Sequence, residues 1–369
     1  MVVKFLDLYK QYEEIKPSID KAIADVIRDS SFVSGPYATR FEKSFAEFQG
    51  APFCVGCGNG TDAIEIAIEA LDLPRGSEIV VPANTFIATS EAVSRCGHKV
   101  VFCDCDPDDY TISVESVRAK LTSRTSAVIV VHLYGQPCNM DSVMELAREH
   151  GLKVIEDCAQ AHGADYKGRR LGTIGDLGTF SFYPGKNLGA YGDAGAITTA
   201  DAKLAERVRM IANHGRIAKY DHEFEGRNSR LDGMQAAILT AKLEHLETWL
   251  SRRAAVAQRY HAALRGVGDL ILPAQRNWGR HVHHLFVVRT AHRDALQDFL
   301  KKRGIETGVH YPIALPKLKA YAHLGQAEDK LVANRFDGQV LSLPIGDHMD
   351  AEDVDEVVRA CTAFFEIAR

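Results

Sequence analysis

Apolar runs of strand length alternate with amphipathic helical spacing through the middle of the chain. The predicted strands span residues 53–57, 78–82, 99–104, 126–134, 153–157, 178–184 and 195–200. The predicted helices between them span residues 61–73, 85–96, 113–121 and 139–151. Most of the strands are apolar at consecutive positions, which indicates burial on both faces. The pattern therefore predicts an α/β fold built on a mainly parallel sheet that helices cover.

The pattern changes near residue 231, where helical spacing continues to residue 264 with a predicted bend or break near residue 250. A strand at 283–290, a helix at 293–304 and a closing helix at 351–368 follow. We therefore predict two domains. Residues 1–245 form a large domain that includes an N-terminal helical segment, and residues 246–369 form a smaller C-terminal α+β domain.

Length and composition narrow the class of protein. The chain has 369 residues, 46% of them hydrophobic and 25% charged, with a net charge of −5. This balance is ordinary for a globular protein and argues against nucleic acid or an anionic membrane as the main partner. The start lacks the features of a signal peptide, and apolar runs such as 127–131 are far too short to cross a bilayer. We predict a cytoplasmic protein with no membrane segment.

The cysteines and histidines do not form a convincing metal-binding pattern. Eight cysteines are present, and two short pairs, Cys54 with Cys57 and Cys103 with Cys105, lack a matching second pair. Most of the eight lie within apolar stretches of the sequence, which is typical of cysteines that serve as small core residues. His281 and His283 are predicted to share one face of a strand next to His284, but no third ligand is apparent. We predict no metal site.

Four chemically distinctive features fall at the ends of predicted strands. Thr61 follows the glycines of GCGNG at a helix start, which favours a phosphate. Phe86 follows the second strand, Asp157 ends the strand KVIED, and Lys186 follows a Pro-Gly turn in TFSFYPGKN. Ligands of parallel sheets bind beyond the carboxyl ends of the strands. A phosphate cradle, an aromatic face, a carboxylate and a lysine together fit pyridoxal 5′-phosphate (PLP).

Each feature alone has a simpler explanation. Thr61 is equally suited to cap a helix, Phe86 to a place in the core, and Asp157 to pairing with an arginine. A single loop lysine is usually solvated. The coincidence of all four at one edge of one sheet favours the cofactor.

The order of motifs carries a resemblance over nearly the whole chain. GNGTDA, PANTF, VIEDCAQAHGA, TFSFYPGKNLGAYGDAGA, NSRLDGMQAAIL and GVHYP closely resemble the DegT/DnrJ/EryC/StrS family of sugar aminotransferases, which are fold-type I PLP enzymes. YPGKNLGA looks most like the members that aminate C3 of dTDP-3-keto-6-deoxyhexoses. The resemblance implies an aspartate-aminotransferase-like large domain and deoxyamino sugar biosynthesis.

The resemblance also implies how the cofactor is held. Lys186 forms the Schiff base and then moves protons, Asp157 pairs with the pyridine nitrogen, and Gln160 reaches the ring hydroxyl. Phe86 stacks on the ring. The phosphate is held by three further groups: Thr61, the backbone amide of Asp62, and Ser181.

Substrates and a second subunit follow from the same resemblance. Asn228, in NSRLD, is expected to reach a phosphate in the neighbouring subunit, which makes the homodimer obligatory. Tyr183, His310 and Tyr311 are expected on the substrate side. The expected substrates are a dTDP-linked keto sugar and L-glutamate.

Three alternatives remain open. The first is amination at C4 or of a UDP-sugar, and the second is a related sugar dehydratase, which has histidine in place of Lys186. The third is a relative that kept the fold as a regulatory protein. One departure from the family pattern is Ala194, which replaces a glycine in GDAGA. An alanine there is strained only if its φ is positive.

Overall fold

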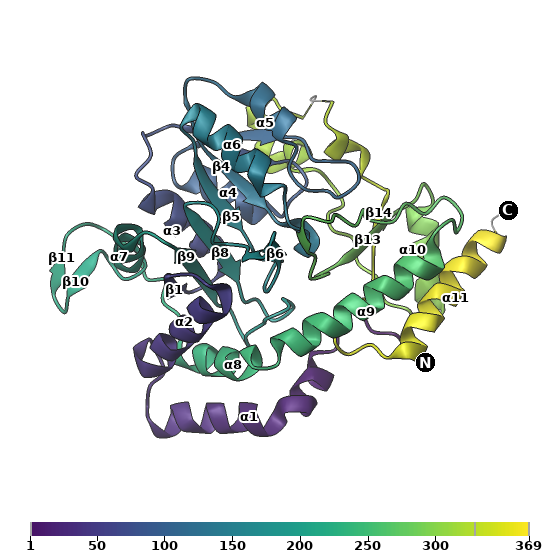
Figure 1. The fold of residues 1–369 in the computed structure, drawn as a ribbon, viewed down its shortest axis with the longest axis horizontal. Helices are drawn as coiled ribbons and strands as arrows, with labels where there is room; N and C mark the ends of the chain where they lie inside the picture. The colour runs from purple at the N-terminus through teal and green to yellow at the C-terminus, as the bar shows by residue number, and fades with distance from the viewer. Residues whose placement is uncertain (1, 328–329, 368–369) are drawn as a thin grey trace.

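The computed structural model describes residues 2–327 and 330–367. Its largest element is a seven-stranded sheet with helices on both faces, and a smaller group of strands and helices lies beside it (Figure 1). The strands of the large sheet are β1 (Phe53–Cys57), β2 (Glu78–Pro82), β3 (Lys99–Cys103), β4 (Thr125–Val131), β5 (Lys153–Asp157), β8 (Leu177–Ser181) and β9 (Gly195–Thr199). All seven predicted strands are present.

The order of the strands across this sheet is β1-β9-β8-β5-β4-β2-β3. Strand β9 pairs antiparallel with both of its neighbours, and every other pairing in the sheet is parallel. The prediction of a mainly parallel sheet is therefore confirmed. The parallel strands β2, β4, β5 and β8 bring their carboxyl ends to one edge of the sheet, as expected for a binding site.

Two sets of helices bury the two faces. Alternate residues of β2 show the division, because Ile79 and Val81 pack in one cluster and Val80 in the other. The first cluster is covered by α3 (Gly60–Ala70), α4 (Ile87–Arg95) and α7 (Ala202–Ile211). The second is covered by α2 (Gly35–Gln49), α5 (Val114–Lys120), α6 (Met140–His150) and α8 (Gly233–Leu243).

The N-terminal helix α1 (Leu8–Arg28) packs along α8, which places it at the bottom of Figure 1. Its Ile15 and Ile19 form a small cluster with Ile238 and Trp249. Helix α7 was not predicted. The minor elements of this part of the chain are η1 (Leu133–Gly135), β6 (Asp165–Tyr166), β7 (Arg169–Arg170), and the hairpin of β10 (Arg216–Ala218) and β11 (Asp221–His222).

The C-terminal part has its own apolar core around an antiparallel strand pair. Its elements are α9 (Leu246–Leu264), β12 (Gly279–Arg280), β13 (Phe286–Arg289), α10 (Arg293–Lys302), β14 (Val340–Leu343) and α11 (Ala351–Ile367). Three short 3-10 helices, η2 (Leu315–Lys317), η3 (Lys319–Leu324) and η4 (Val332–Arg335), lie between α10 and β14. Residue 368, the last of the predicted closing helix, lies outside the described residues.

The predicted break near residue 250 is wrong in position. Helix α8 ends at Leu243 and α9 begins at Leu246, with Glu244 and His245 between them. The sequence KLEHLE contains no glycine or proline that would mark the end of one helix and the start of the next. Residues 314–327 and 330–336 also return from the C-terminal part to the core of the large sheet, where Tyr321 and Phe336 are buried. The proposed domain boundary at 245/246 stays a prediction.

Two expectations about composition can be compared with the structure. Seven of the eight cysteines are buried, Cys96 is half-buried, and all eight are free thiols. They serve as core residues, as predicted. Within residues 2–327 and 330–367, no helix is both long and apolar enough to cross a membrane.

Candidate functional site

A cavity of about 620 Å³ lies at the carboxyl ends of the parallel strands. This volume is within the range of small-molecule sites. The cavity brings together nine of the predicted site residues, which are Thr61, Phe86, Asp157, Gln160, Ser181, Tyr183, Lys186, His310 and Tyr311. Asp62 and Asn228 are not among the residues that line it.

Lys186 enters the cavity from the turn after β8. Its backbone N–H donates to the carbonyl of Tyr183 at 2.9 Å, which closes the Pro-Gly turn. Within the described chain, its ammonium group has no hydrogen-bond partner. Burial lowers the pKa of Lys186 to about 8, against the opposing effect of Asp157. A larger fraction of this amine is therefore neutral near pH 8 than for an ordinary lysine, and the neutral form is the nucleophile.

Asp157 ends β5 with its carboxylate held in place. Oδ2 accepts from the Thr89 hydroxyl at 2.9 Å and Oδ1 accepts from the Ala159 amide at 3.1 Å. Burial raises the pKa of Asp157, while these two hydrogen bonds and Lys186 act in the opposite direction. A buried carboxylate of this kind is suited to share a proton with a basic ring nitrogen.

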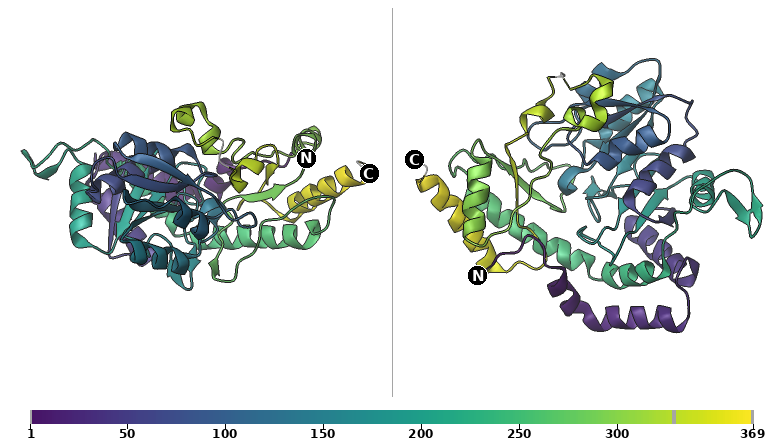
Figure 2. Two further views of the ribbon diagram at one scale, coloured as in Figure 1. Left: turned by 90° about the horizontal axis from the view of Figure 1, so that it is seen from above. Right: turned by 180° about the vertical axis from the view of Figure 1, so that it is seen from behind.

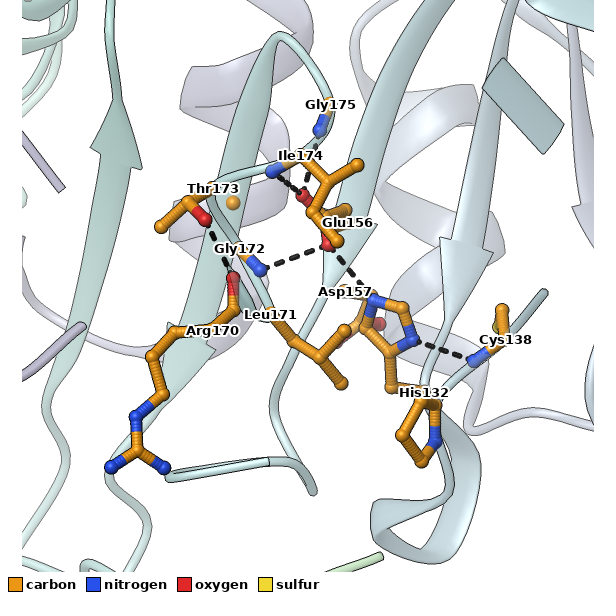
Figure 3. Close-up of polar contacts among 12 residues, drawn as sticks. His132, Cys138, Glu156, Asp157, Arg170, Leu171, Gly172, Thr173, Ile174 and Gly175 are labelled. Atoms are coloured by element: carbon orange, nitrogen blue, oxygen red, sulfur yellow. Dashed lines mark hydrogen bonds and ion pairs between the residues drawn. The ribbon is translucent and has the colours of Figure 1, made fainter. Parts of the chain in front are cut away.

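The neighbouring Glu156 is a structural residue whose partners the sequence did not reveal (Figure 3). It is fully buried and accepts hydrogen bonds from the amides of Gly172, Ile174 and Gly175 at 2.7–2.9 Å. Burial would raise its pKa, but His132 and these amides hold the pKa below its usual value. The acid therefore fixes the loop before β8, the strand that leads to the cavity lysine.

His132 completes this buried network. Its Nδ1 accepts from the amide of Cys138 at 3.1 Å, so Nε2 carries the proton that is shared with Glu156 at 3.1 Å. The backbone N–H of His132 donates to the carbonyl of Asp157. A buried charge needs such pairing, and here the pairing also positions the carboxylate of the site.

The start of α3 forms a narrow cradle opposite β8. Gly60 approaches Ser181 so closely that a Cβ at position 60 would lie 2.5 Å from the Cβ of Ser181. Asn59, Gly60, Thr61 and Ser181 all line the cavity. A helix N-terminus flanked by two hydroxyl side chains is a suitable phosphate site. The amide of Asp62, however, donates to Oδ1 of Asn59 at 2.8 Å, so its predicted contact to a phosphate requires that this bond be exchanged.

Aromatic and amide groups form the opposite wall. Phe86 caps α4 and lies 5.7 Å, centroid to centroid, from Tyr311. Gln160 accepts from the Tyr134 amide at 2.6 Å and donates to the Tyr311 hydroxyl at 3.1 Å. The Gln160 side chain thereby holds Tyr311 in place beside the cavity.

Asn228 lies outside the cavity, in a segment anchored to α3. It forms an isolated β-bridge with Asn213. The Ser229 hydroxyl donates to Oδ2 of Asp62 at 2.6 Å and accepts from the amide of Gly58 at 3.0 Å. The Asp62 side chain therefore connects GTDA to NSRLD.

The alanine in GDAGA fits without strain. Ala194 is not among the residues with positive φ, and its side chain is 1% exposed within the core. Its carbonyl accepts from the amide of Phe182 at 2.8 Å. The adjacent Gly195 is the constrained position, because a Cβ there would lie 2.4 Å from the carbonyl oxygen of Asn59.

The predicted strand geometry of the histidine cluster is wrong. Residues 281–284 precede β13, and His283 has a positive φ of 46°. The rings of His281 and His283 stack 3.9 Å apart, and Nδ1 of His281 accepts from the amide of His283. Across the described chain, the one group with metal-ligand spacing is His132, Glu156 and Cys158. Its histidine and carboxylate already have the protein partners given above.

These features fit PLP. The cavity combines a half-buried lysine of lowered pKa, a buried carboxylate, an aromatic ring at a helix start, and a cradle at the N-terminus of α3. Lys186, Asp157 and Phe86 would hold the ring, and Thr61 and Ser181 would hold the phosphate.

Comparison with known proteins agrees with the geometry. The family model "DegT/DnrJ/EryC1/StrS aminotransferase family" matches residues 13–362. A dTDP-3-amino-3,4,6-trideoxy-alpha-D-glucose transaminase of Streptomyces venezuelae is 44% identical over 99% of this chain and 96% of its own length. A dTDP-3-amino-3,6-dideoxy-alpha-D-galactopyranose transaminase of Aneurinibacillus thermoaerophilus is 44% identical over 98% of this chain and 99% of its own.

Solved structures confirm the fold. The crystal structure of S. venezuelae DesV in complex with a ketimine intermediate has a TM-score of 0.97 at 44% identity, and each chain covers 99% of the other. The expected cofactor is also confirmed, since members of this family use PLP and one was solved with bound cofactor PMP. The chain therefore belongs to the DegT/DnrJ/EryC1/StrS aminotransferase family.

Proposed function

We propose that the protein transfers an amino group from L-glutamate to C3 of a dTDP-linked 3-keto-6-deoxyhexose. The observation that carries this proposal is Lys186, a lysine of lowered pKa facing the buried Asp157 across one cavity. The two relatives described above, each 44% identical, are named for dTDP-3-amino sugars. Lys186 also argues against the dehydratase alternative, which has histidine at that position.

The residues divide the work between binding and proton transfer. PLP, when bound, supplies an aldehyde carbon that reacts with amines and a ring that accepts electrons. With its pKa lowered to about 8, the Lys186 amine is about half neutral at pH 8, and as a free amine beside the donor it would move a proton from the donor's α-carbon. Asp157 would hold the ring nitrogen protonated. After 2-oxoglutarate has left, Lys186 would make the corresponding proton transfer at C3 of the keto sugar.

The wall of the cavity accommodates the sugar substrate. Tyr183 is 59% exposed and offers uncovered aromatic surface next to the lysine, whereas the cofactor ring would cover the exposed face of Phe86. His310 is held by Ser342 at 2.8 Å from Nδ1 to Oγ, and burial lowers its pKa to about 4. A neutral histidine at this place is suited to hydrogen-bond a sugar hydroxyl.

We further propose that the working form is a homodimer with composite sites. Asn228 does not line the cavity of its own protomer, so a contact to a phosphate requires another protomer. The β10–β11 hairpin projects from the body in both figures, with Ile217 53% and Tyr220 87% exposed (Figures 1 and 2). Phe32 and Val33 add further uncovered apolar surface. Such surface is typical of an interface.

A panel of dTDP- and UDP-linked 3-keto and 4-keto sugars tests this function. Each is incubated with the loaded enzyme and L-glutamate, and products are read by mass and NMR. We expect the 3-amino product from a dTDP-3-keto-6-deoxyhexose. A product from a 4-keto sugar or a UDP-sugar alone would replace the proposed substrate, and no product from any sugar would favour a regulatory relative.

A further inference from the structure

A buried arginine lines the cavity, and neither the family resemblance nor the sequence pattern assigned it a role. Arg253 lies on α9, its side chain is 3% exposed, and it borders the same cavity as Lys186. Among the lining residues that the structure describes, it is the single arginine. His284 lines the same cavity, and burial, Lys186 and Arg253 together depress its pKa.

The guanidinium is only partly satisfied by protein groups. Its Nη1 donates to the carbonyls of His283, His284 and Ile345 at 3.1–3.4 Å. Its Nη2 lies 3.7 Å from Oδ1 of Asp347, which is an ion pair but too long for a hydrogen bond. In the described chain, Nε and Nη2 have no hydrogen-bond acceptor. A guanidinium offers five N–H donors in a rigid fork, so the Nε and Nη2 donors remain for a ligand.

Asp347 compensates the charge of Arg253 incompletely. Its other oxygen, Oδ2, accepts from Nε2 of Gln11 at 3.2 Å. The buried Lys242 also interacts electrostatically with Asp347. One carboxylate therefore faces two buried cations, and an additional anion next to Arg253 would be stabilised.

We propose that Arg253 binds a carboxylate of the amino donor through its Nε and Nη2 donors. This inference rests on the proposed function, because it concerns the donor of the same reaction. A planar carboxylate matches the fork of a guanidinium in two parallel hydrogen bonds. The burial of Arg253 indicates that it binds the amino donor rather than the other anionic substrate, the sugar nucleotide. Arg253 is enclosed, whereas Tyr183, which is 59% exposed, marks the side from which a bulky sugar nucleotide enters.

Single-turnover measurements on the loaded enzyme test the assignment. With Arg253→Gln, we expect glutamate to convert the cofactor roughly 100-fold less efficiently, as expected for loss of a buried charge partner. Arg253→Lys keeps the charge without the fork, and we expect an intermediate loss of roughly tenfold. Arg252→Gln is the matched control, because Arg252 is the adjacent residue of α9 and pairs with Glu14 at the surface. It should behave as wild type.

L-Alanine, which lacks the side-chain carboxylate, identifies the group that is bound. A loss with both alanine and glutamate assigns Arg253 to the α-carboxylate, and a loss with glutamate alone assigns it to the γ-carboxylate. Unchanged glutamate conversion in Arg253→Gln overturns the proposal.

Thermal shifts separate this inference from the proposed function and from a purely structural role. Glutarate, a dicarboxylic acid without an amine, should raise the Tm of the wild-type holoenzyme and not that of Arg253→Gln. dTDP should raise the Tm of both. If the glutarate shift is absent in the wild type, or if the substitution removes the dTDP shift instead, the assignment to the donor is wrong. A wild type that accepts no keto sugar but responds to glutarate through Arg253 would contradict only the proposed sugar substrate.

Discussion

The floor and the mouth of the cavity differ in how completely a single protomer buries their side chains and pairs them in hydrogen bonds. At the floor, Asp157 is buried and accepts hydrogen bonds from Thr89 and the Ala159 amide. The preceding Glu156, which does not line the cavity, is fully buried and accepts hydrogen bonds from His132 and three amides. At the mouth, Tyr183 is 59% exposed. Elsewhere on the surface, the projecting β10–β11 hairpin, none of whose residues lines the cavity, carries Tyr220 at 87% exposure. The floor is therefore determined by the packing of a single chain. The mouth has aromatic surface that its own chain leaves uncovered.

This difference reflects two requirements of the site, which are rigid placement of the charged groups and accessibility of the groups that recognise the substrate. Groups that bear charge during the reaction are held rigidly, because a displaced buried charge costs free energy and no longer points toward the reacting atoms. Groups that recognise a large substrate are placed where a ligand or a second protomer can cover them. Substitutions at the floor should therefore abolish chemistry or destabilise the fold, and substitutions at the hairpin should affect assembly alone.

The largest effect is expected from Lys186→Ala. This change removes the nucleophile and the proton carrier together, so turnover should fall by at least about 10⁴-fold. Turnover is measured with saturating L-glutamate and the accepted keto sugar. The absorbance band of lysine-bound PLP should also be lost, whereas circular dichroism should show an unchanged fold. Normal turnover would exclude Lys186 from the chemistry.

A smaller loss is expected from Asp157→Asn. The substitution preserves the shape of the side chain but removes the charge that would lie opposite the ring nitrogen, and its single amide oxygen can accept from Thr89 or from the Ala159 amide but not from both. We expect turnover to fall by about 10³-fold, in line with other losses of one preorganised electrostatic partner. Glutamate half-reaction rates provide the measurement. A loss of less than tenfold would indicate that another group protonates the ring.

Glu156→Gln should affect stability rather than a particular chemical step. Its oxygens accept three backbone hydrogen bonds and one from His132, and the amide of Gln offers one acceptor oxygen in place of two. We expect the free energy of unfolding to fall by about 3–5 kcal/mol. Chemical denaturation of the cofactor-free protein measures this. Asp176→Asn, at a less buried site on the same loop side, is a control that should cost less.

The pH dependence of cofactor loading should follow the amine of Lys186. Because its pKa is lowered to about 8, the neutral fraction should rise about tenfold between pH 7 and pH 9 and then level off. The rate at which cofactor-free protein reacts with PLP should rise in the same way. Lys242 also has a pKa near 8 but donates to the Gly189 carbonyl outside the cavity. Lys186→Ala therefore gives the baseline, and a midpoint near 10.5 would contradict burial as the controlling effect.

The smallest effect on the protomer is expected at the β10–β11 hairpin, which does not line the cavity. Tyr220→Ser should change the free energy of unfolding by less than about 0.5 kcal/mol, because the side chain is almost fully exposed. Sedimentation should instead show a weaker dimer. A substantially destabilised protomer would mean that the hairpin supports the core of its own chain rather than a contact with a second protomer.

The sequence predicted the large sheet well because its strands are short apolar runs with the same burial on both faces. It could not predict that β9 is antiparallel between β1 and β8, since pairing direction depends on contacts between distant segments. We predicted the helix break near residue 250 rather than at Glu244 and His245 because the local sequence favours helix throughout. The break becomes apparent only from the packing of α9 against the apolar core of the C-terminal part.

The candidate site shows the same limit. Lys186 and Asp157 were identifiable because each stands next to a strand end with a local signal. The partner of Glu156, His132, lies 24 residues earlier, directly after β4, and no local pattern connects them. Arg253 was missed because it follows another arginine in an amphipathic helix. The sequence does not show that Arg252 faces solvent while Arg253 faces the cavity.

The close approach of Gly60 to Ser181 has an evolutionary consequence. A methyl group at position 60 has no room while position 181 carries a side chain, and the conflict is with a Cβ rather than with a mobile tip. The two positions, 121 residues apart in the sequence, should therefore change together across related chains or not at all. Replacing Ser181 by glycine would relieve only part of the conflict, because the Cα of residue 181 would still lie 3.1 Å from a Cβ at position 60.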